Sequence, residues 1–228
     1  SKNLLRSMLE NNITKIIFSS SATVYGRRKN TVYKENMRLS PINIYGHTKK
    51  TIEDLIKKLK KENKINYVIL RYFNPAGCHS SGLLGEEPKG KPENLFPFIT
   101  KIIQGNFKQL NIYGKSYPTK DGTGARDYIH IEDLVNAHIK SIKIVNNKKS
   151  NILNIGSGKA YTVLEIINSF KKKTKFNIRF KFKKERKGDL PIYLTNNYKA
   201  KKTIEWQPKK SIDDICASTY KYAKARIR

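Results

Sequence analysis

The 228-residue chain carries 47 Lys and Arg against 18 Asp and Glu, a formal net charge of +29. Its length corresponds to one or two domains, and its apolar runs predict a folded core rather than global disorder. No run of 18 apolar residues predicts a membrane-spanning helix, and the first residues have no apolar signal region. Cys78 and Cys216 are too few for a disulfide framework, so we expect a cytoplasmic protein.

The positive charge comes mostly from lysines spread along the whole chain. This distribution is typical of a solvated surface, with a basic surface that attracts phosphate-bearing substrates as the functional alternative. The sequence has no zinc-finger spacing, ribonucleoprotein motif or basic heptad pattern. We therefore expect no dedicated nucleic-acid binding.

The first 73 residues predict alternating helices and strands. Helical spacing over 4–12 is followed by a short apolar run at 15–20, which indicates a buried strand. A polar loop leads to a helix over about 43–63, and a second buried strand follows at 67–73. Strand, helix and strand in this order favour a parallel unit whose strand ends meet at the ligand-binding edge of the sheet.

Residues 74–94 are rich in Gly and Pro and indicate a long functional loop. The rest of the chain predicts helices near 95–105, 132–146, 163–173 and 211–226, and strands near 109–113, 127–131, 152–155 and 178–182. The alternation predicts an α/β protein.

Tyr45 and Lys49 stand one helical turn apart at the start of the helix over 43–63. An ammonium group near a phenol favours the phenolate. Lowering a tyrosine pKa from ~10 to ~7 needs about 4 kcal/mol of differential stabilisation. The phenolate could then remove a proton from a substrate hydroxyl. A half-exposed tyrosine beside a solvated lysine is the alternative, because this spacing is common in helices.

A run of three serines, Ser19 to Ser21, closes the first buried strand. Serines at a strand end commonly form turns and caps. Here the last of them lies about 24 residues before Tyr45, between a buried strand and the next helix. A serine hydroxyl at that strand end could contact both the substrate and the phenol. The two motifs together favour a catalytic role.

Four segments in chain order resemble one family: SSSATVYG at 19–26, the Tyr and Lys of 45–49, RYFNPAG at 71–77, and DGTGARDYIH at 121–130. They are similar to the UDP-glucose 4-epimerase family of the extended short-chain dehydrogenases/reductases. The resemblance implies interconversion of UDP-glucose and UDP-galactose with bound NAD, in galactose metabolism. It also implies a homodimer of the full-length enzyme, formed through helices near 1–11 and 43–63.

The resemblance implies a Rossmann-type doubly wound parallel sheet, truncated at its N-terminal side, with a smaller α/β substrate-binding domain. Residues 1–74 would be the C-terminal part of the NAD-binding domain. Residues 75–228 would be mainly the UDP-sugar-binding domain, with some segments returning to the Rossmann sheet.

The resemblance also implies roles for individual residues. Catalysis would fall to Ser21, Tyr45 and Lys49. NAD would contact Ser19, Tyr45, Lys49 and Tyr72. The UDP-sugar would contact Ser21, Asn74, Asn94, Leu95, Asn111, Tyr113, Arg126, Arg186, Asp189 and Tyr193. No metal is expected, since Cys78 and His79 alone are too few ligands for zinc.

Tyr193 bears on the choice of sugar. A bulky residue at the matching position in the family is associated with exclusion of N-acetylated sugars. The resemblance therefore implies the UDP-glucose and UDP-galactose pair, with a packing role for Tyr193 as the alternative.

The sequence departs from the family in one respect. The family begins with a strand and a Gly-x-x-Gly-x-x-Gly turn that receives the NAD pyrophosphate, and these 228 residues contain no such pattern. Relative to the family, about 100 N-terminal residues are missing. We therefore expect a fragment that alone neither retains NAD nor turns over substrate.

Three alternatives stay open. A related nucleotide-sugar 4,6-dehydratase or decarboxylase is disfavoured because Ser21-Ala22-Thr23 lacks the acid pair of the dehydratases. A UDP-N-acetylglucosamine 4-epimerase differs in its sugar. An inactive truncated remnant would act only as a binding protein.

Overall fold

The computed structural model describes residues 1–28, 32–186 and 188–227. The chain forms two compact units, each built from three segments. Unit 1 comprises Ser1–Phe73, Val135–Gly156 and Thr195–Gln207. Unit 2 comprises Asn74–Leu134, Ser157–Leu194 and Pro208–Arg228.

Unit 1 contains a three-stranded parallel sheet in the order β1-β3-β7. The strands are β1 (Lys15–Ser21), β3 (Asn66–Tyr72) and β7 (Asn151–Ile155). The register pairs Ser21 with Tyr72, and Tyr72 with Ile155. The three strands therefore end at one edge, as expected where an open α/β sheet binds its ligand.

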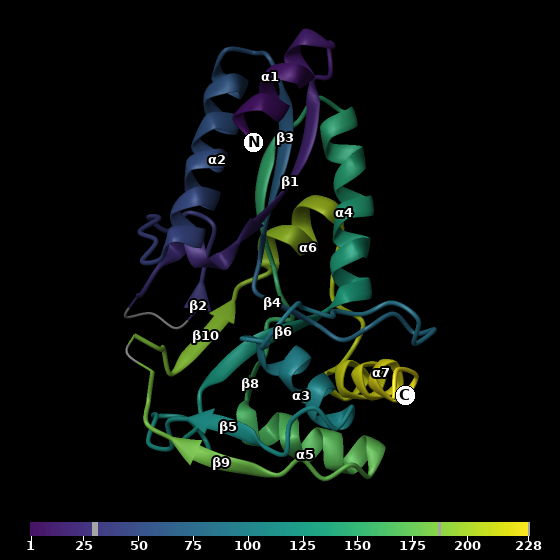
Figure 1. Ribbon diagram of the computed structural model, residues 1–228. Helices are drawn as coiled ribbons and strands as arrows, with labels where there is room; N and C mark the ends of the chain where they lie inside the picture. Colours follow the sequence, from purple (N-terminus) through teal and green to yellow (C-terminus); the bar gives the residue numbers. More distant parts are fainter. Residues whose placement is uncertain (29–31, 187, 228) are drawn as a thin grey trace. The chain divides into compact units, whose positions relative to one another are not determined.

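Helices cover both faces of this sheet, with α2 on one side and most of α4 on the other (Figure 1). The helical segments are α1 (Lys2–Glu10), the 3₁₀ helix η1 (Ala22–Tyr25), α2 (Ile44–Lys61), α4 (Ile131–Asn146) and α6 (Tyr198–Ile204); a short strand, β2, spans Val32–Tyr33. Leu5 and Met8 of α1 pack with Ile56 of α2 and Ile69 of β3. The apolar stripe of α2 is thus buried in the core of its own unit.

The sheet of unit 2 is organised around β6 (Ala125–His130), which pairs in parallel with β4 and β10 and antiparallel with β8. These partners span Asn74–Ala76, Ile192–Thr195 and Ala160–Thr162 respectively. A separate parallel pair joins β5 (Leu110–Tyr113) to β9 (Phe180–Lys183).

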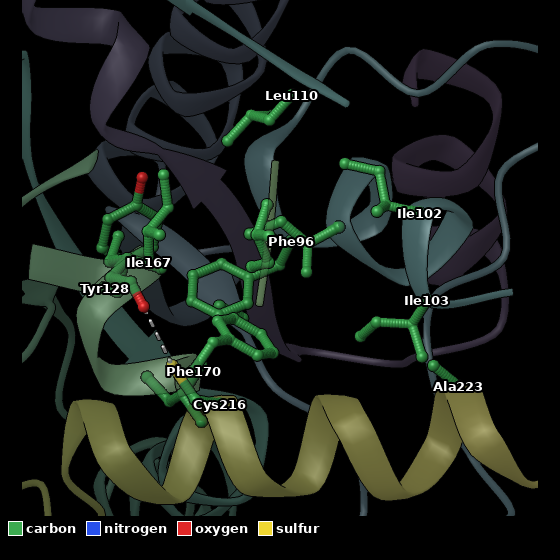
Figure 2. Packing of buried hydrophobic residues seen from close by; sticks show 14 of the residues in the cluster. Phe96, Ile102, Ile103, Leu110, Tyr128, Ile167, Phe170, Cys216 and Ala223 are labelled. Atoms are coloured by element: carbon green, nitrogen blue, oxygen red, sulfur yellow. Dashed lines mark hydrogen bonds between the residues drawn. The ribbon is translucent and has the colours of Figure 1, made fainter. Parts of the chain in front are cut away.

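The core of unit 2 lies among its three helices and these strands (Figure 2). The helices are α3 (Leu95–Ile103), α5 (Val163–Thr174) and α7 (Ile212–Lys224). The Phe96 ring lies 5.2 Å from Tyr128 and 5.9 Å from Phe170, centroid to centroid. The aromatic contacts tie α3, β6 and α5 together.

The predicted α/β class with parallel strands is confirmed, and every expected helix and strand is present with ends shifted by a few residues. Six short elements were not predicted: η1, β2, β4, β8, β10 and α6. The stretch from 74 to 94 therefore begins with a strand, where the sequence predicted only a loop. No helix in the described ranges is long and apolar enough to cross a membrane.

Candidate functional site

Tyr45 and Lys49 lie on the first turns of α2, as the spacing predicted. The helix begins at Ile44 because the Asn43 side chain accepts a hydrogen bond of 2.7 Å from the Gly46 backbone N–H. Tyr45 is 54% exposed, so its phenol can meet a substrate. The Lys49 Nζ lies 5.4 Å from the centroid of the Tyr45 ring.

The Lys49 ammonium is fixed at the end of β1. Its Nζ donates a hydrogen bond of 2.9 Å to the Ser19 carbonyl oxygen and lies 5.1 Å from the centroid of the Phe18 ring. Burial lowers the pKa of Lys49. A partly desolvated lysine thus stands beside the Tyr45 ring.

Gly46 allows α2 to approach η1, the 3₁₀ helix that follows Ser21. A Cβ at Gly46 would lie 2.7 Å from the Thr23 carbonyl oxygen. Ser21 caps η1, its Oγ accepting hydrogen bonds from the Thr23 backbone N–H at 3.2 Å and the Thr23 hydroxyl at 3.0 Å. Close packing at Gly46 therefore holds the first turn of α2, which carries Tyr45, against the segment that carries Ser21.

Ser19 and Tyr72 meet at the ends of β1 and β3. The Tyr72 hydroxyl donates to Ser19 Oγ at 2.7 Å and is hydrogen-bonded to His138 Nε2 of α4 at 2.5 Å. Burial, partly offset by the Ser19 hydrogen bond, raises the pKa of Tyr72 to about 12. Sequence analysis missed His138, whose partners lie far away in the chain and left no local signal.

A buried ion pair between Arg71 and Glu53 stabilises the sheet edge at the ends of β1 and β3. Arg71 of β3 donates through Nε to Glu53 Oε1 at 2.9 Å and through Nη2 to Oε2 at 2.6 Å. The Ser20 hydroxyl donates to the same carboxylate at 2.6 Å, and Arg71 Nη1 donates to the Tyr25 hydroxyl at 2.9 Å. The network joins α2 to β1, η1 and β3, and its members Ser20 and Arg71 are chain neighbours of Ser19, Ser21 and Tyr72.

In unit 2, Arg126 of β6 and Asp189 form an ion pair between Nη2 and Oδ1. Arg126 Nη1 also donates to the carbonyl oxygens of Ala125 at 2.9 Å and Leu190 at 2.7 Å. These bonds hold the guanidinium in a fixed orientation. Tyr193 of β10 lies in register with Arg126.

The Arg186 guanidinium lies 3.9 Å from the centroid of the Tyr113 ring, a cation–π contact at the end of β5. Two residues before Tyr113 on the same strand, the side-chain oxygen of Asn111 is buried and has no hydrogen-bond partner among the described residues. A buried acceptor without a donor is costly, which points to an absent ligand group.

The remaining predicted contacts lie elsewhere in unit 2. The Asn74 amide of β4 donates to the Asp127 carbonyl oxygen at 2.9 Å. Asn94 precedes α3 without a side-chain capping bond, and Leu95 is the first residue of that helix. The structure thus places Ser19, Ser21, Tyr45, Lys49 and Tyr72 in unit 1, and the other predicted site residues in unit 2. Within the described ranges, no three His, Cys, Asp or Glu side chains are grouped to hold a metal ion.

Comparison with known proteins gives consistent matches. The family model described as GDP-mannose 4,6 dehydratase matches residues 2–219. UDP-glucose 4-epimerase of Bacillus subtilis is 37% identical over 226 residues, 98% of this chain and 67% of the relative. The Yersinia pestis enzyme is 40% identical over 220 residues, 95% of this chain and 65% of the relative. The chain thus spans about two thirds of the length of these relatives.

Solved structures agree with the sequence matches. UDP-glucose 4-epimerase from Stenotrophomonas maltophila, with bound NAD and formylated UDP-arabinopyranose, has a TM-score of 0.94 at 35% identity, covering 97% of this chain and 67% of its own. The Bifidobacterium longum enzyme, in complex with NAD+ and UDP, has a TM-score of 0.91 at 39% identity, covering 98% and 67%. The Tyr45 and Lys49 spacing on α2, the serine-rich strand end and these matches lead to one assignment: the chain belongs to the UDP-glucose 4-epimerase family of the extended short-chain dehydrogenases/reductases.

Proposed function

We propose that the chain is the catalytic and nucleotide-binding part of a UDP-glucose 4-epimerase, which interconverts UDP-glucose and UDP-galactose. The observation that carries this proposal is the placement of Lys49. Its ammonium bonds to the Ser19 carbonyl and lies 5.4 Å from the ring centroid of an exposed Tyr45. That arrangement suits removal of a proton from a sugar hydroxyl.

Tyr45 acts as the base in this proposal. Beside Lys49, it takes the proton from the C4 hydroxyl of the hexose. Ser21 Oγ already accepts two hydrogen bonds from Thr23. Its own O–H can therefore donate a hydrogen bond to the oxygen at C4 of the sugar. The C4 hydride would pass to the implied cofactor NAD and leave a 4-keto sugar. After the sugar rotates, the hydride would return to the opposite face of C4 and Tyr45 would give its proton back to the C4 oxygen.

The nucleotide half of the substrate stays anchored while the hexose rotates. Arg126 and Arg186 supply forked donors for the diphosphate, and Asp189 accepts from ribose hydroxyls. Tyr113 offers an aromatic face, and Asn111 an unsatisfied oxygen, to the uracil. The Asn74 amide together with Asn94 and Leu95 extends the contacts toward the sugar and diphosphate.

NAD is the implied cofactor, and it supplies hydride acceptance and return at C4. The residues present fit its nicotinamide end. Lys49 is fixed at the strand edge with a cationic head for a ribose hydroxyl, and Ser19 and Tyr72 present hydroxyl oxygens beside it. A glycine-rich pyrophosphate turn does not occur in these 228 residues, so the fit concerns one end of the cofactor.

The finer points of the proposal follow from particular residues. Tyr193, in register with Arg126, is the bulky residue that favours glucose and galactose over N-acetylated sugars. The full-length enzyme would form a homodimer through α1 and α2, where Leu4 is 61% exposed. Two free cysteines, Cys78 and Cys216, suit a cytoplasmic compartment.

A dehydratase is the second candidate, since the matching family model carries that description. The strand end argues against it. Ala22 is buried and has no titratable group, and the Thr23 hydroxyl is engaged with Ser21. No carboxylic acid stands at these positions to expel water from the sugar.

The test is a chimera in which the N-terminal third of the Bacillus subtilis relative precedes Ser1. We expect it to convert UDP-galactose to UDP-glucose. UDP-N-acetylgalactosamine and a dehydratase substrate serve as comparison substrates. A folded chimera that binds UDP and NAD but epimerises neither sugar pair would contradict the proposal, and would favour the inactive remnant.

A further inference from the structure

Tyr117 has a buried hydroxyl with no partner. It lies in the turn between β5 and β6, and its phenol oxygen forms no hydrogen bond among the described residues. The backbone is fully engaged: its N–H donates to the Gly122 carbonyl at 3.0 Å, and its carbonyl accepts from Thr119 at 2.7 Å. Removing a hydroxyl from water without a partner is unfavourable, so this group calls for an explanation.

The Tyr117 ring is held in place by the backbone beneath it. Gly114, at φ +85°, leaves open the space that the ring fills, because a Cβ there would lie 2.4 Å from Tyr117 Cε2. The same absent Cβ would lie 2.9 Å from Glu185 Cγ. Close packing therefore fixes the direction of the hydroxyl, which cannot easily turn to solvent.

The hydroxyl lies in a charged environment of two arginines and two carboxylates. Arg126, Arg186, Asp189 and Glu185 all act on it electrostatically, and burial with the two carboxylates raises its pKa. The phenol is therefore a protonated donor at neutral pH. Three of these four side chains belong to the proposed nucleotide site.

Asn111 provides an independent observation in the same unit. Its buried side-chain oxygen also lacks a partner, on the strand that ends at Tyr113 next to Gly114. Asn111 of β5 and Tyr117 of the turn that follows thus each bury a polar atom that finds no partner among the described residues, and each such atom calls for an explanation.

We infer that Tyr117 is a further nucleotide-binding residue, whose phenol O–H donates a hydrogen bond to an oxygen of the ribose–diphosphate part of UDP. This inference rests on the proposed function, because it completes the same site. Tyr117 has no place in the chemical step. It contributes affinity for the nucleotide that anchors the rotating sugar.

The experiment compares Tyr117→Phe with the unchanged chain, by calorimetric titration with UDP and by thermal unfolding without ligand. We expect the UDP affinity to fall about tenfold, the effect of losing one hydrogen bond to a ligand. The Tm without ligand should stay equal or rise, because the lost hydroxyl had no partner. Tyr220→Phe, on α7 and outside the site, is the matched control and should change neither quantity.

The outcomes separate the two proposals. If the unchanged chain binds UDP and Tyr117→Phe binds it equally well, the inference about Tyr117 is wrong while the proposed function stands. If Tyr117→Phe clearly lowers the Tm without ligand, the hydroxyl has a structural partner and the inference is also wrong. If the unchanged chain does not bind UDP, the proposed nucleotide site fails, and the role of Tyr117 fails with it.

Discussion

Glu53 and Arg71 form a bidentate ion pair that is almost completely buried. The Glu53 side chain is 0% exposed and that of Arg71 is 2% exposed, with Nη2 and Oε2 2.6 Å apart. Glu53 lies one helical turn after Lys49 on α2, and Arg71 directly precedes Tyr72 on β3. The pair therefore fixes the helix that carries the proposed base against the strand that carries Tyr72.

Breaking this pair should destabilise unit 1. Glu53→Gln leaves the Arg71 guanidinium buried without its counter-charge, and such a loss typically costs about 3–5 kcal/mol. Urea unfolding measures the change in the free energy of unfolding. Asp54→Asn, the adjacent residue with partly exposed partners Lys50 and Lys57, is the control and should cost less than about 1 kcal/mol. Equal losses of unfolding free energy for the two variants would show that the buried pair stabilises unit 1 no more than the surface pairs of Asp54 do.

The sequence predicted the main elements because their periodicity is local. The apolar runs at β1 and β3 and the stripe of α2 are long enough to be recognised. The missed elements are short, and one contains a residue that argues against a strand. Pro75 lies inside β4, where it is tolerated because β4 is the edge strand of this sheet and, among the described residues, pairs with β6 alone.

In the candidate site, too, the sequence predicts only those contacts that are local in the chain. Tyr45 and Lys49 are one helical turn apart, so the sequence brings them together. Glu53 and Arg71 meet only through the fold, although an arginine inside an apolar strand does signal that an acidic partner is required. Tyr117 precedes a proline in a turn, and only the structure shows that its hydroxyl is buried.

Tyr45→Phe should remove the base without disturbing the nucleotide site. In the chimera with the relative's N-terminal third, we expect turnover to fall about 10²- to 10⁴-fold, the usual contribution of a positioned acid or base. UDP affinity, measured by calorimetry, should be unchanged. Tyr198→Phe, an exposed tyrosine of unit 1, should leave both quantities intact. Loss of UDP binding together with turnover in Tyr45→Phe would indicate a structural role for Tyr45.

His130 should make unit 2 less stable as the pH falls below about 6.5. Its side chain is 2% exposed, Nδ1 accepts a hydrogen bond of 3.1 Å from the Glu132 N–H, and Nε2 contacts the Ser218 hydroxyl at 3.1 Å. Burial lowers the pKa of His130 from its ordinary 6.5. The unfolded chain therefore takes up a proton before the folded chain does, and stability present above pH 6.5 is lost as the pH falls.

The measurement for His130 is urea unfolding at pH 7.5 and 5.5. His130→Asn keeps a hydrogen-bonding side chain without a group that titrates in this range, so we expect a smaller difference between the two pH values in this variant. Carboxylates such as Asp213 and Asp214, whose pKa values are lowered by hydrogen bonds, lose their contribution at more acidic pH. The same pH difference in the variant would assign the effect to other groups.

The 228 residues alone should neither retain NAD nor turn over substrate. A pyrophosphate-binding glycine-rich turn does not occur among them, although the residues that we propose for the nucleotide half are present. Purified chain mixed with NAD and UDP-galactose should give no UDP-glucose above background, while UDP binding stays measurable. The chimera is the positive control, and UDP-glucose formed by the isolated chain would refute this expectation.

An exposed apolar stripe on α4 should promote self-association of the chain and binding of hydrophobic dyes. Val135, Ile139 and Ile142 share one face of the helix and are 51%, 58% and 48% exposed. Ile139→Lys places a charge in the middle of the stripe, so we expect weaker binding of a hydrophobic dye and less self-association in sedimentation experiments. Since the side chain is largely exposed, the free energy of unfolding should change by less than about 0.5 kcal/mol.

The control for α4 is Leu83→Lys, which replaces a loop residue of unit 2 that is 68% exposed and lies outside both the stripe and the helices of the proposed dimer. Both variants add one positive charge to a chain of net charge +29, so general repulsion is matched between them. If the stripe is the surface that associates, Ile139→Lys reduces dye binding and self-association much more than Leu83→Lys. Equal reductions would mean that charge alone sets the association, because a local apolar contact is disrupted only by a substitution within it.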